Sequence, residues 1–416
     1  MRSIFIGIYA YLALFLAPAV IAAPLQTGLD RLVATDFAAL KGKKVGLITN
    51  PTGVDRQLRS TVDIFAASKA IRLVSLFGPE HGLRGDHSAG DKVADSIDPV
   101  TQLPVHSLYG SQRKPTATML AGLDALVFDI QDIGVRSYTY IATLGLAMEA
   151  AAENGVEFVV LDRPNPLGGL RIEGPLPADG RTSFVAPYPI PYVHGLTVGE
   201  LATLINESGW LAGGLRAKLT VIPMRGWRRN MTFEATGLPW VPSSPHIPQA
   251  ATAALYPATG IIGELSPSMI GIGYTLPFGV MAATNLDAET FANSIRALKL
   301  PGVQVRPLYF IPYYSNGSGR RHGGVQIYLN LSEVRSLSLL QFQIMEVLIR
   351  QSPEANPFVL HTDRLDMFDK VVADPAIRVA FAQRWSAADV EPLWTDRKST
   401  RLNSSHRSLS RMPSSA

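Results

Sequence analysis

Short apolar segments alternate with helical patterns through the first half of the chain. Four of these segments end in a cluster of Asp, Asn, Arg and Gly residues, and they span residues 44–50, 73–77, 125–129 and 158–162. A helical pattern rich in Ala, Leu and Met at residues 140–154 separates the last two. Strand, polar loop, helix and strand in this order are typical of a parallel sheet. The pattern predicts an α/β domain with a mainly parallel sheet, whose polar strand ends meet at one edge.

The second half of the chain has a different pattern. The strands and amphipathic helices expected there lie at residues 303–310, 324–329, 337–349 and 374–382. We therefore expect a smaller α+β domain at residues 261–395, after an α/β domain at residues 23–260. A proline-rich loop at residues 163–193 interrupts the first domain, and loops of this length are usually functional. Thr197 and Glu200 then form a capping-box pattern, which predicts a helix running to Glu207.

The two ends of the chain differ in character from the rest. Arg2, an apolar stretch and small residues before Ala23 predict a signal peptide at residues 1–22, and hence a periplasmic or secreted protein. No later segment is long enough to span a membrane. Residues 396–416 have no apolar periodicity and resemble translated adapter sequence, so we expect a non-native tail that lacks the natural C-terminus.

Composition excludes several classes of site. The chain contains no cysteine, so it has no disulfide framework and no cysteine-ligated metal. Its formal net charge is +4, but the tail carries +4 and the signal peptide +1, which leaves about −1 and no support for nucleic-acid binding. The loop after the first strand lacks Gly-x-Gly-x-x-Gly, so a dinucleotide is not indicated, and no cofactor is expected.

Polar and titratable side chains that suit a ligand-binding or catalytic site follow the expected strands. Glu80, His81 and Arg84 come directly after residues 73–77, among glycines that let the backbone approach a ligand. Further candidates lie in the other loops: Asn50, Asp129, Asp132, Arg136, Tyr138, Asp162, Arg163, Asn165, Glu173, Tyr192 and His194.

The loops contain six ordered motifs. They are Gly-Leu-Ile-Thr-Asn-Pro-Thr-Gly (46–53), Phe-Gly-Pro-Glu-His-Gly-Leu-Arg-Gly (77–85), Asp-Ile-Gln-Asp-Ile-Gly-Val-Arg-Ser-Tyr-Thr-Tyr (129–140), Leu-Asp-Arg-Pro-Asn-Pro-Leu-Gly-Gly (161–169), Glu-Gly-Pro (173–175) and His-Gly-Leu-Thr (194–197). Over roughly residues 28–394 the chain resembles the DUF1343 family, whose characterised members are exo-β-N-acetylmuramidases of the NamZ type. The resemblance implies a Rossmann-like N-terminal domain, a smaller C-terminal domain and a cleft between them.

The chain departs from the family pattern in two places. An arginine that family members often carry in a Gly-Arg-Gly-Thr segment is absent at residues 271–275, and the preceding Glu-Gly-Thr-Asn segment corresponds to Gly263-Glu264-Leu-Ser. The usual Pro-Ser-Pro-Asn is replaced by Ser-Ser-Pro-His at residues 243–246. Both segments fall where the second domain is expected to meet the cleft, so they bear on which sugar is preferred.

The resemblance implies an exo-acting hydrolase that releases N-acetylmuramic acid from the non-reducing end of peptidoglycan fragments. Glycoside hydrolysis uses two carboxyl groups. We expect Glu80 to be the general acid, positioned by His81. Glu173, Asp132, Asp129 and Asp162 remain open as the second carboxylate, with Glu173 and Asp132 preferred.

Substrate binding is expected to need anion and hydroxyl partners. The lactyl carboxylate of muramic acid calls for arginine, and the candidates are Arg84, Arg136 and Arg163. Tyr138, Tyr192 and His194 are expected to bind sugar hydroxyls, and Asn50 and Asn165 to contact the substrate. Two alternatives stay open. One is a metal-dependent hydrolase with ligands from His81, His87, Asp129 and Asp132. The other is a periplasmic glycan-binding protein without turnover.

Overall fold

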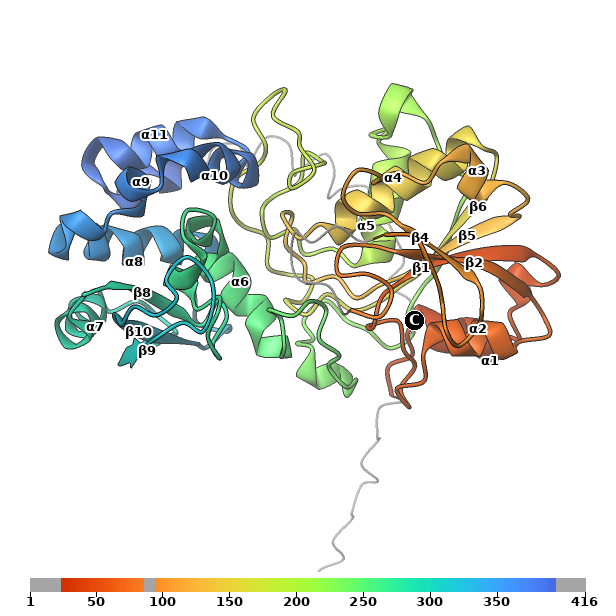
Figure 1. Ribbon diagram of the computed structural model, residues 1–416, viewed down its shortest axis with the longest axis horizontal. Helices are drawn as coiled ribbons and strands as arrows, with labels where there is room; N and C mark the ends of the chain where they lie inside the picture. The colour runs from red at the N-terminus through yellow and green to blue at the C-terminus, as the bar shows by residue number, and fades with distance from the viewer. Residues whose placement is uncertain (1–23, 86–93, 394–416) are drawn as a thin grey trace, which may run out of the picture.

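The computed structural model describes residues 24–85 and 94–393. The predicted signal peptide, the predicted tail and His87 lie outside these residues. A seven-stranded sheet in the order β3-β4-β2-β1-β5-β6-β7 forms the N-terminal part (Figure 1). Its strands are β1 (Lys44–Thr49), β2 (Arg72–Gly78), β3 (Ser96–Ile97), β4 (Pro104–Ser107), β5 (Ala125–Asp129), β6 (Glu157–Leu161) and β7 (Leu219–Ile222). Only β3 pairs antiparallel among these described strands, so the predicted parallel sheet is confirmed.

The carboxyl ends of the four predicted strands lie in register. Ile48 of β1 pairs with Phe77 of β2, Thr49 pairs with Asp129 of β5, and Phe128 pairs with Val160 of β6. The loops that begin with Asn50, Pro79, Ile130 and Asp162 therefore leave the sheet at one edge, as the apolar pattern predicted. Parallel α/β sheets bind their ligands at this edge.

Helices cover both faces of this sheet (Figure 1). The helices are α1 (Gly28–Ala34), α2 (Thr61–Ala67), α3 (Ala117–Leu120), α4 (Tyr140–Glu153) and α5 (Val198–Glu207). Successive strand residues point to opposite faces, so Val127 packs in the core beneath α1 and α2, and Phe128 in the core beneath α4. The predicted capping box is present, because Thr197 accepts from Glu200 N and Glu200 accepts from Thr197 N.

The C-terminal part is a smaller α+β unit, as predicted. Its antiparallel sheet has the order β8-β10-β9 and consists of β8 (Val280–Thr284), β9 (Val303–Phe310) and β10 (His322–Leu329). Its helices are α6 (Ala250–Gly263), α7 (Ala288–Ala297), α8 (Leu337–Gln351), α9 (Pro357–Leu360), α10 (Leu365–Val372) and α11 (Pro375–Arg384). The domain boundary expected at residue 260 falls inside α6, which lies between the two parts in Figure 1.

The proline-rich loop at residues 163–193 contains no helix or ladder strand, only isolated bridges such as Glu173 to Val193. Arg136 fixes this loop to the C-terminal unit. Its buried guanidinium donates to four backbone carbonyls, those of Pro175, Ile190, Val371 and Val372, the last two at the end of α10. A hydrogen bond to a charged donor stabilises more than a neutral one. This arginine therefore joins the two parts of the chain.

Candidate active site

Glu80 lies in the loop that follows β2, with its side chain half-buried. The hydroxyl of Thr139 donates to Glu80 Oε2 at 2.6 Å. Burial and the neighbouring charge of Glu80 raise the pKa of Tyr109, whose hydroxyl hydrogen-bonds to the same carboxylate. The next residue, His81, has a φ of 71°, a strained value for a non-glycine residue of the kind that concentrates at functional sites.

A layer of hydroxyl groups surrounds Glu80. The Tyr138 hydroxyl lies 2.8 Å from Ser243 Oγ, and the Tyr140 hydroxyl donates to the Ser243 carbonyl at 2.5 Å. Ser137 contacts the hydroxyl groups of Tyr192 and Tyr256 at 3.1 and 3.2 Å. Burial, together with the charges of Asp132 and Glu80, raises the pKa of Tyr138. The loop after β5 is thus joined to the segment that leads into α6, with Glu80 at the joint.

Glu264 provides a second carboxyl group from the other side of the junction. It caps the carboxyl end of α6, and its side chain is 29% exposed beside Arg364, at 3.5 Å. Burial raises the pKa of Glu264 to about 7; Arg364 opposes this shift, and the negative charge of Glu80 adds to it. The Glu264 carboxyl group is therefore only partly accessible to solvent. Glu264 was not among the predicted site residues, and its only signal in the sequence is its place in one of the segments that depart from the family pattern.

Asp132 and His194 form a buried pair near Tyr138. Asp132 Oδ2 accepts from Gly134 N at 2.6 Å and lies 3.8 Å from His194 Nε2. Burial raises the pKa of Asp132 to about 7 and lowers that of His194 to about 3. The neutral His194 accepts from Leu196 N at Nδ1, so its proton is at Nε2. Asp132 Oδ1 and His194 Nε2 are buried and have no hydrogen-bond partner among the described residues.

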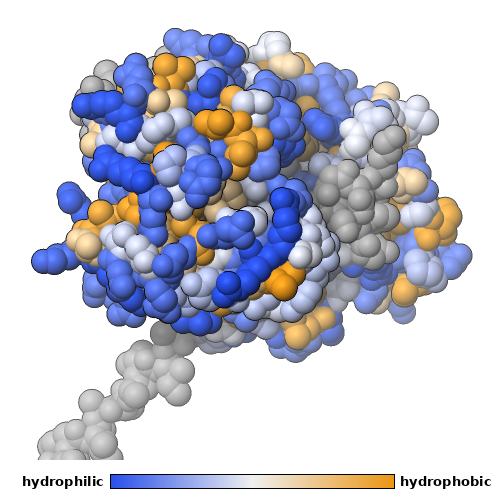
Figure 2. Space-filling model, turned by 60° about the vertical axis from the view of Figure 1, so that its left-hand side comes forward, coloured by the Kyte–Doolittle hydropathy of each residue, from blue (hydrophilic) through white to orange (hydrophobic). Residues whose placement is uncertain are grey.

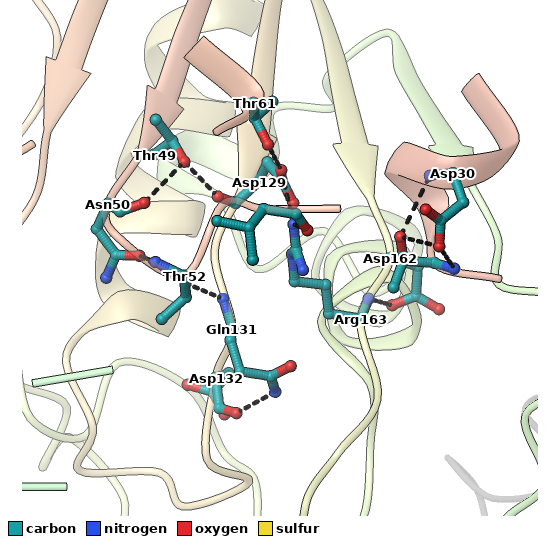
Figure 3. Close-up of polar contacts among 12 residues, drawn as sticks. Asp30, Thr49, Asn50, Thr52, Thr61, Asp129, Gln131, Asp132, Asp162 and Arg163 are labelled. Atoms are coloured by element: carbon teal, nitrogen blue, oxygen red, sulfur yellow. Dashed lines mark hydrogen bonds and ion pairs between the residues drawn. The ribbon is translucent and has the colours of Figure 1, made fainter. Parts of the chain in front are cut away.

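Asn50, Asp129 and Arg163 hold the edge of the sheet together (Figure 3). Asn50 Oδ1 accepts from the Thr52 backbone and hydroxyl, and Thr52 in turn accepts from Gln131 N. Arg163 donates twice to Asp129, at 2.5 and 2.9 Å. Both members of this ion pair are buried, so their charges neutralise each other beneath the loops.

Three other candidates bind backbone groups. Asp162 accepts from Thr197 Oγ1 and Gly199 N, which caps α5. Asn165 accepts from Leu167 N and donates to the Leu196 carbonyl. Both oxygens of Glu173 accept from Leu337 N at 2.9 and 3.0 Å, at the start of α8. Glu173 therefore connects the proline-rich loop to the C-terminal unit.

Most of the candidate arginines already donate hydrogen bonds to other groups of the protein. Arg136 and Arg163 are buried in the contacts given above, and Arg84 donates to Asp98 at 2.6 and 3.1 Å with a 40% exposed side chain. Sequence reasoning missed Arg113. Its exposed guanidinium lies 4.2 Å from the ring centre of Phe184, and its charge acts on Tyr109, the neighbour of Glu80. An Arg stacked on an aromatic ring keeps its N–H groups available for an anion.

Within the described ranges, no three His, Asp or Glu side chains are grouped so as to hold a metal ion. Of the ligands considered for a metal site, His87 is outside those ranges. In the same part of the chain, none of the helices has the length and apolar character needed to cross a bilayer.

Two carboxyl groups at the junction of a Rossmann-like domain and a smaller α+β domain are compatible with a glycoside hydrolase, and the similarity to a known beta-N-acetylmuramidase shows this class. Comparison with known proteins specifies the family. Residues 45–251 match the family model for exo-beta-N-acetylmuramidase NamZ, N-terminal, and residues 254–400 match the C-terminal model. The chain belongs to the exo-β-N-acetylmuramidase NamZ family, as its motifs indicated.

Individual relatives agree with this assignment. The chain is 48% identical to the peptidoglycan beta-N-acetylmuramidase NamZ of Bacillus subtilis (strain 168), over 73% of this chain and 72% of that protein. A DUF1343 family protein from Bacteroides fragilis superposes with a TM-score of 0.87 at 47% identity, covering 92% of this chain and 98% of that one. A second DUF1343 protein from the same organism gives a TM-score of 0.70 at 27% identity, with 93% and 98% coverage.

Proposed function

We propose that the protein releases N-acetylmuramic acid from the non-reducing end of peptidoglycan fragments, and that Glu80 and Glu264 are its two catalytic carboxyl groups. The observation that carries the proposal is their arrangement. They come from opposite sides of the domain junction, both are partly accessible, and the negative charge of Glu80 acts on Glu264. Two such carboxyl groups flank the scissile bond in most glycoside hydrolases.

The environments of the two groups suggest different roles. Glu264, with a pKa of about 7, holds a proton at neutral pH and donates it to the glycosidic oxygen as the C1–O bond breaks. Glu80, which accepts from two hydroxyl groups, supplies the carboxylate that attacks C1 or takes a proton from the attacking water. The proposal moves the general acid from Glu80, where sequence reasoning had placed it, to Glu264.

The terminal sugar is proposed to bind at the buried end of the site, beside Asp132 and His194. Each of these residues has a buried polar atom without a partner among the described residues. Both side chains are buried, at 8% and 3% exposure, and the charges of Asp132 and Glu80 both act on Tyr138. A site that closes at one end admits a chain terminus and not the middle of a chain, which supports exo action.

The proposed function is tested by incubating the protein with the disaccharide N-acetylmuramyl-β-1,4-N-acetylglucosamine and with its N-acetylglucosaminyl-first counterpart. We expect free N-acetylmuramic acid from the first and no release from the second, measured by chromatography with mass detection. Binding of both sugars without any release would instead support a glycan-binding protein.

Arg113 is expected to bind the lactyl carboxylate. Arg113→Ala should lower kcat/KM on muramic substrates by about 10- to 100-fold, because a hydrogen bond to a charged group is worth about 1.5–3 kcal/mol. On a matched muramic substrate whose lactyl carboxylate is esterified, and which therefore carries no charge there, Arg113→Ala and the wild type should be equally active. Arg84→Ala is the comparison variant, since Asp98 already neutralises Arg84. A larger muramic-specific loss in Arg84→Ala than in Arg113→Ala would transfer the role to Arg84.

We also propose that the protein is exported to the periplasm or secreted. The support is the charged, apolar and small-residue order of residues 1–22. N-terminal sequencing of protein recovered from the periplasm or medium is expected to begin at Ala23. Protein retained in the cytoplasm with residues 1–22 intact would contradict the proposal.

A further inference from the structure

Two neighbouring tyrosines on the C-terminal unit are unusually exposed. Tyr313 and Tyr314 lie between β9 and β10, with 69% and 55% of their surface accessible. Figure 2, which brings this side of the molecule forward, shows a mainly hydrophilic surface with separate apolar patches. Exposed aromatic side chains are enriched where proteins bind ligands. We call these two residues the tyrosine shelf.

The tyrosine shelf is held in place by the segment at residues 271–275. Tyr313 N donates to the Gly273 carbonyl at 2.7 Å, and the Tyr274 ring lies 5.8 Å from that of Tyr313 and stacks on Phe310 at 4.6 Å. Gly273 has a φ of 90°, and a Cβ there would lie 2.2 Å from the Tyr314 carbonyl oxygen. Only glycine permits this contact. The backbone beneath the shelf is therefore fixed, which lowers the entropy cost of binding a ligand.

Hydrogen bonds and short stretches of backbone together connect the tyrosine shelf to Glu80. The Tyr314 hydroxyl lies 3.0 Å from His246 Nε2. Three residues earlier, Ser243 binds the hydroxyl groups of Tyr138 and Tyr140. These tyrosines flank Thr139, which donates to Glu80. Burial and the charge of His81 lower the pKa of His246, which also places His246 beside the Glu80 loop.

We propose that the tyrosine shelf binds the sugar on the leaving-group side of the scissile bond. This inference rests on the proposed function. If the terminal sugar occupies the buried end at Asp132 and His194, the rest of the glycan must leave past Glu80 toward the accessible side, where Tyr313 and Tyr314 lie. The apolar face of a pyranose ring packs on an aromatic ring, and the Tyr314 hydroxyl, which is oriented by His246, has further hydrogen-bonding capacity for a polar substituent.

The experiment compares two substrates that differ only on the leaving-group side. One is the disaccharide with N-acetylglucosamine as leaving sugar, and the other is N-acetylmuramyl fluoride, whose leaving group is a single atom. We expect Tyr313→Ala and Tyr314→Ala to raise KM for the disaccharide about 3- to 10-fold each, the range that aromatic packing supports. Kinetic constants for the fluoride should stay at wild-type values.

Two further variants serve as controls. Tyr313→Phe keeps the ring and should retain a wild-type KM. Tyr328→Ala removes another exposed tyrosine, 47% accessible and at the opposite end of β10 from His322, and should change neither substrate. Equal losses on both substrates, or no change in KM for the disaccharide, would overturn the inference. Wild-type protein that hydrolyses neither substrate would overturn the proposed function and the tyrosine shelf together.

Discussion

Glu80→Gln is expected to lower kcat on the disaccharide by at least about 10²-fold and up to about 10⁴-fold, the range by which a positioned acid or base accelerates a reaction. Glutamine keeps the shape of the side chain but cannot attack C1 or accept a proton from water. Because Glu80 is proposed to act on C1 itself, the same loss is expected with the fluoride, whose departure needs no proton. KM should change little, since the hydrogen-bonding atoms are retained.

The control for Glu80→Gln is the same substitution at an acidic residue remote from the site. Glu153 at the end of α4 has a 41% exposed side chain, and Glu153→Gln should leave kcat unchanged. A second check uses Thr139→Val, which removes the donor to Glu80 Oε2 and is expected to give a smaller loss. Full activity of Glu80→Gln would remove Glu80 from the mechanism. Unfolding midpoints measured in parallel separate lost chemistry from lost structure.

The parallel sheet was predictable because each of its strands is marked by its own run of residues. Residues 125–129 are fully buried in β5, and a continuous apolar run bounded by polar residues marks such a strand. The capping box at Thr197 is local in the same way. Helix α6 was not predicted, because Pro257 inside it lacks the donor that a helix normally uses. Tertiary packing compensates: Gln341 donates to the Pro257 carbonyl and accepts from Ile262 N.

The site was less predictable, because identical residue types at a strand end serve opposite purposes. Asp162 caps a helix, Asp129 neutralises Arg163, and Asp132 keeps an oxygen without a partner among the described residues. Nothing in the sequence near each aspartate distinguishes these cases, because the deciding partner comes from a distant segment. Glu264 is the clearest example. Its raised pKa depends on burial and on the charge of Glu80, and both arise only when the two domains are in place.

Glu264→Gln is expected to lower kcat on the disaccharide by about 10²–10⁴-fold and to leave hydrolysis of the fluoride nearly intact. The reason is that a sugar leaves only when its oxygen is protonated, whereas fluoride leaves as an anion. The contrast with Glu80→Gln, which should lose both activities, assigns the acid and its partner in one experiment. If Glu264→Gln loses both activities and Glu80→Gln only the first, the general acid is Glu80, as sequence reasoning predicted.

The pH dependence gives an independent measure of the same role. The pKa of Glu264 is raised to about 7, so the protonated form predominates below pH 7 and is lost as the pH rises through that value. An acid catalyst must be protonated, so kcat/KM on the disaccharide should fall about tenfold per pH unit above 7 in the wild type. This fall of kcat/KM above pH 7 should be absent in Glu264→Gln, and it should also be absent when the fluoride is the substrate. Glu80→Gln should shift any residual fall to lower pH, because removing the neighbouring negative charge removes one of the causes that raise the pKa of Glu264.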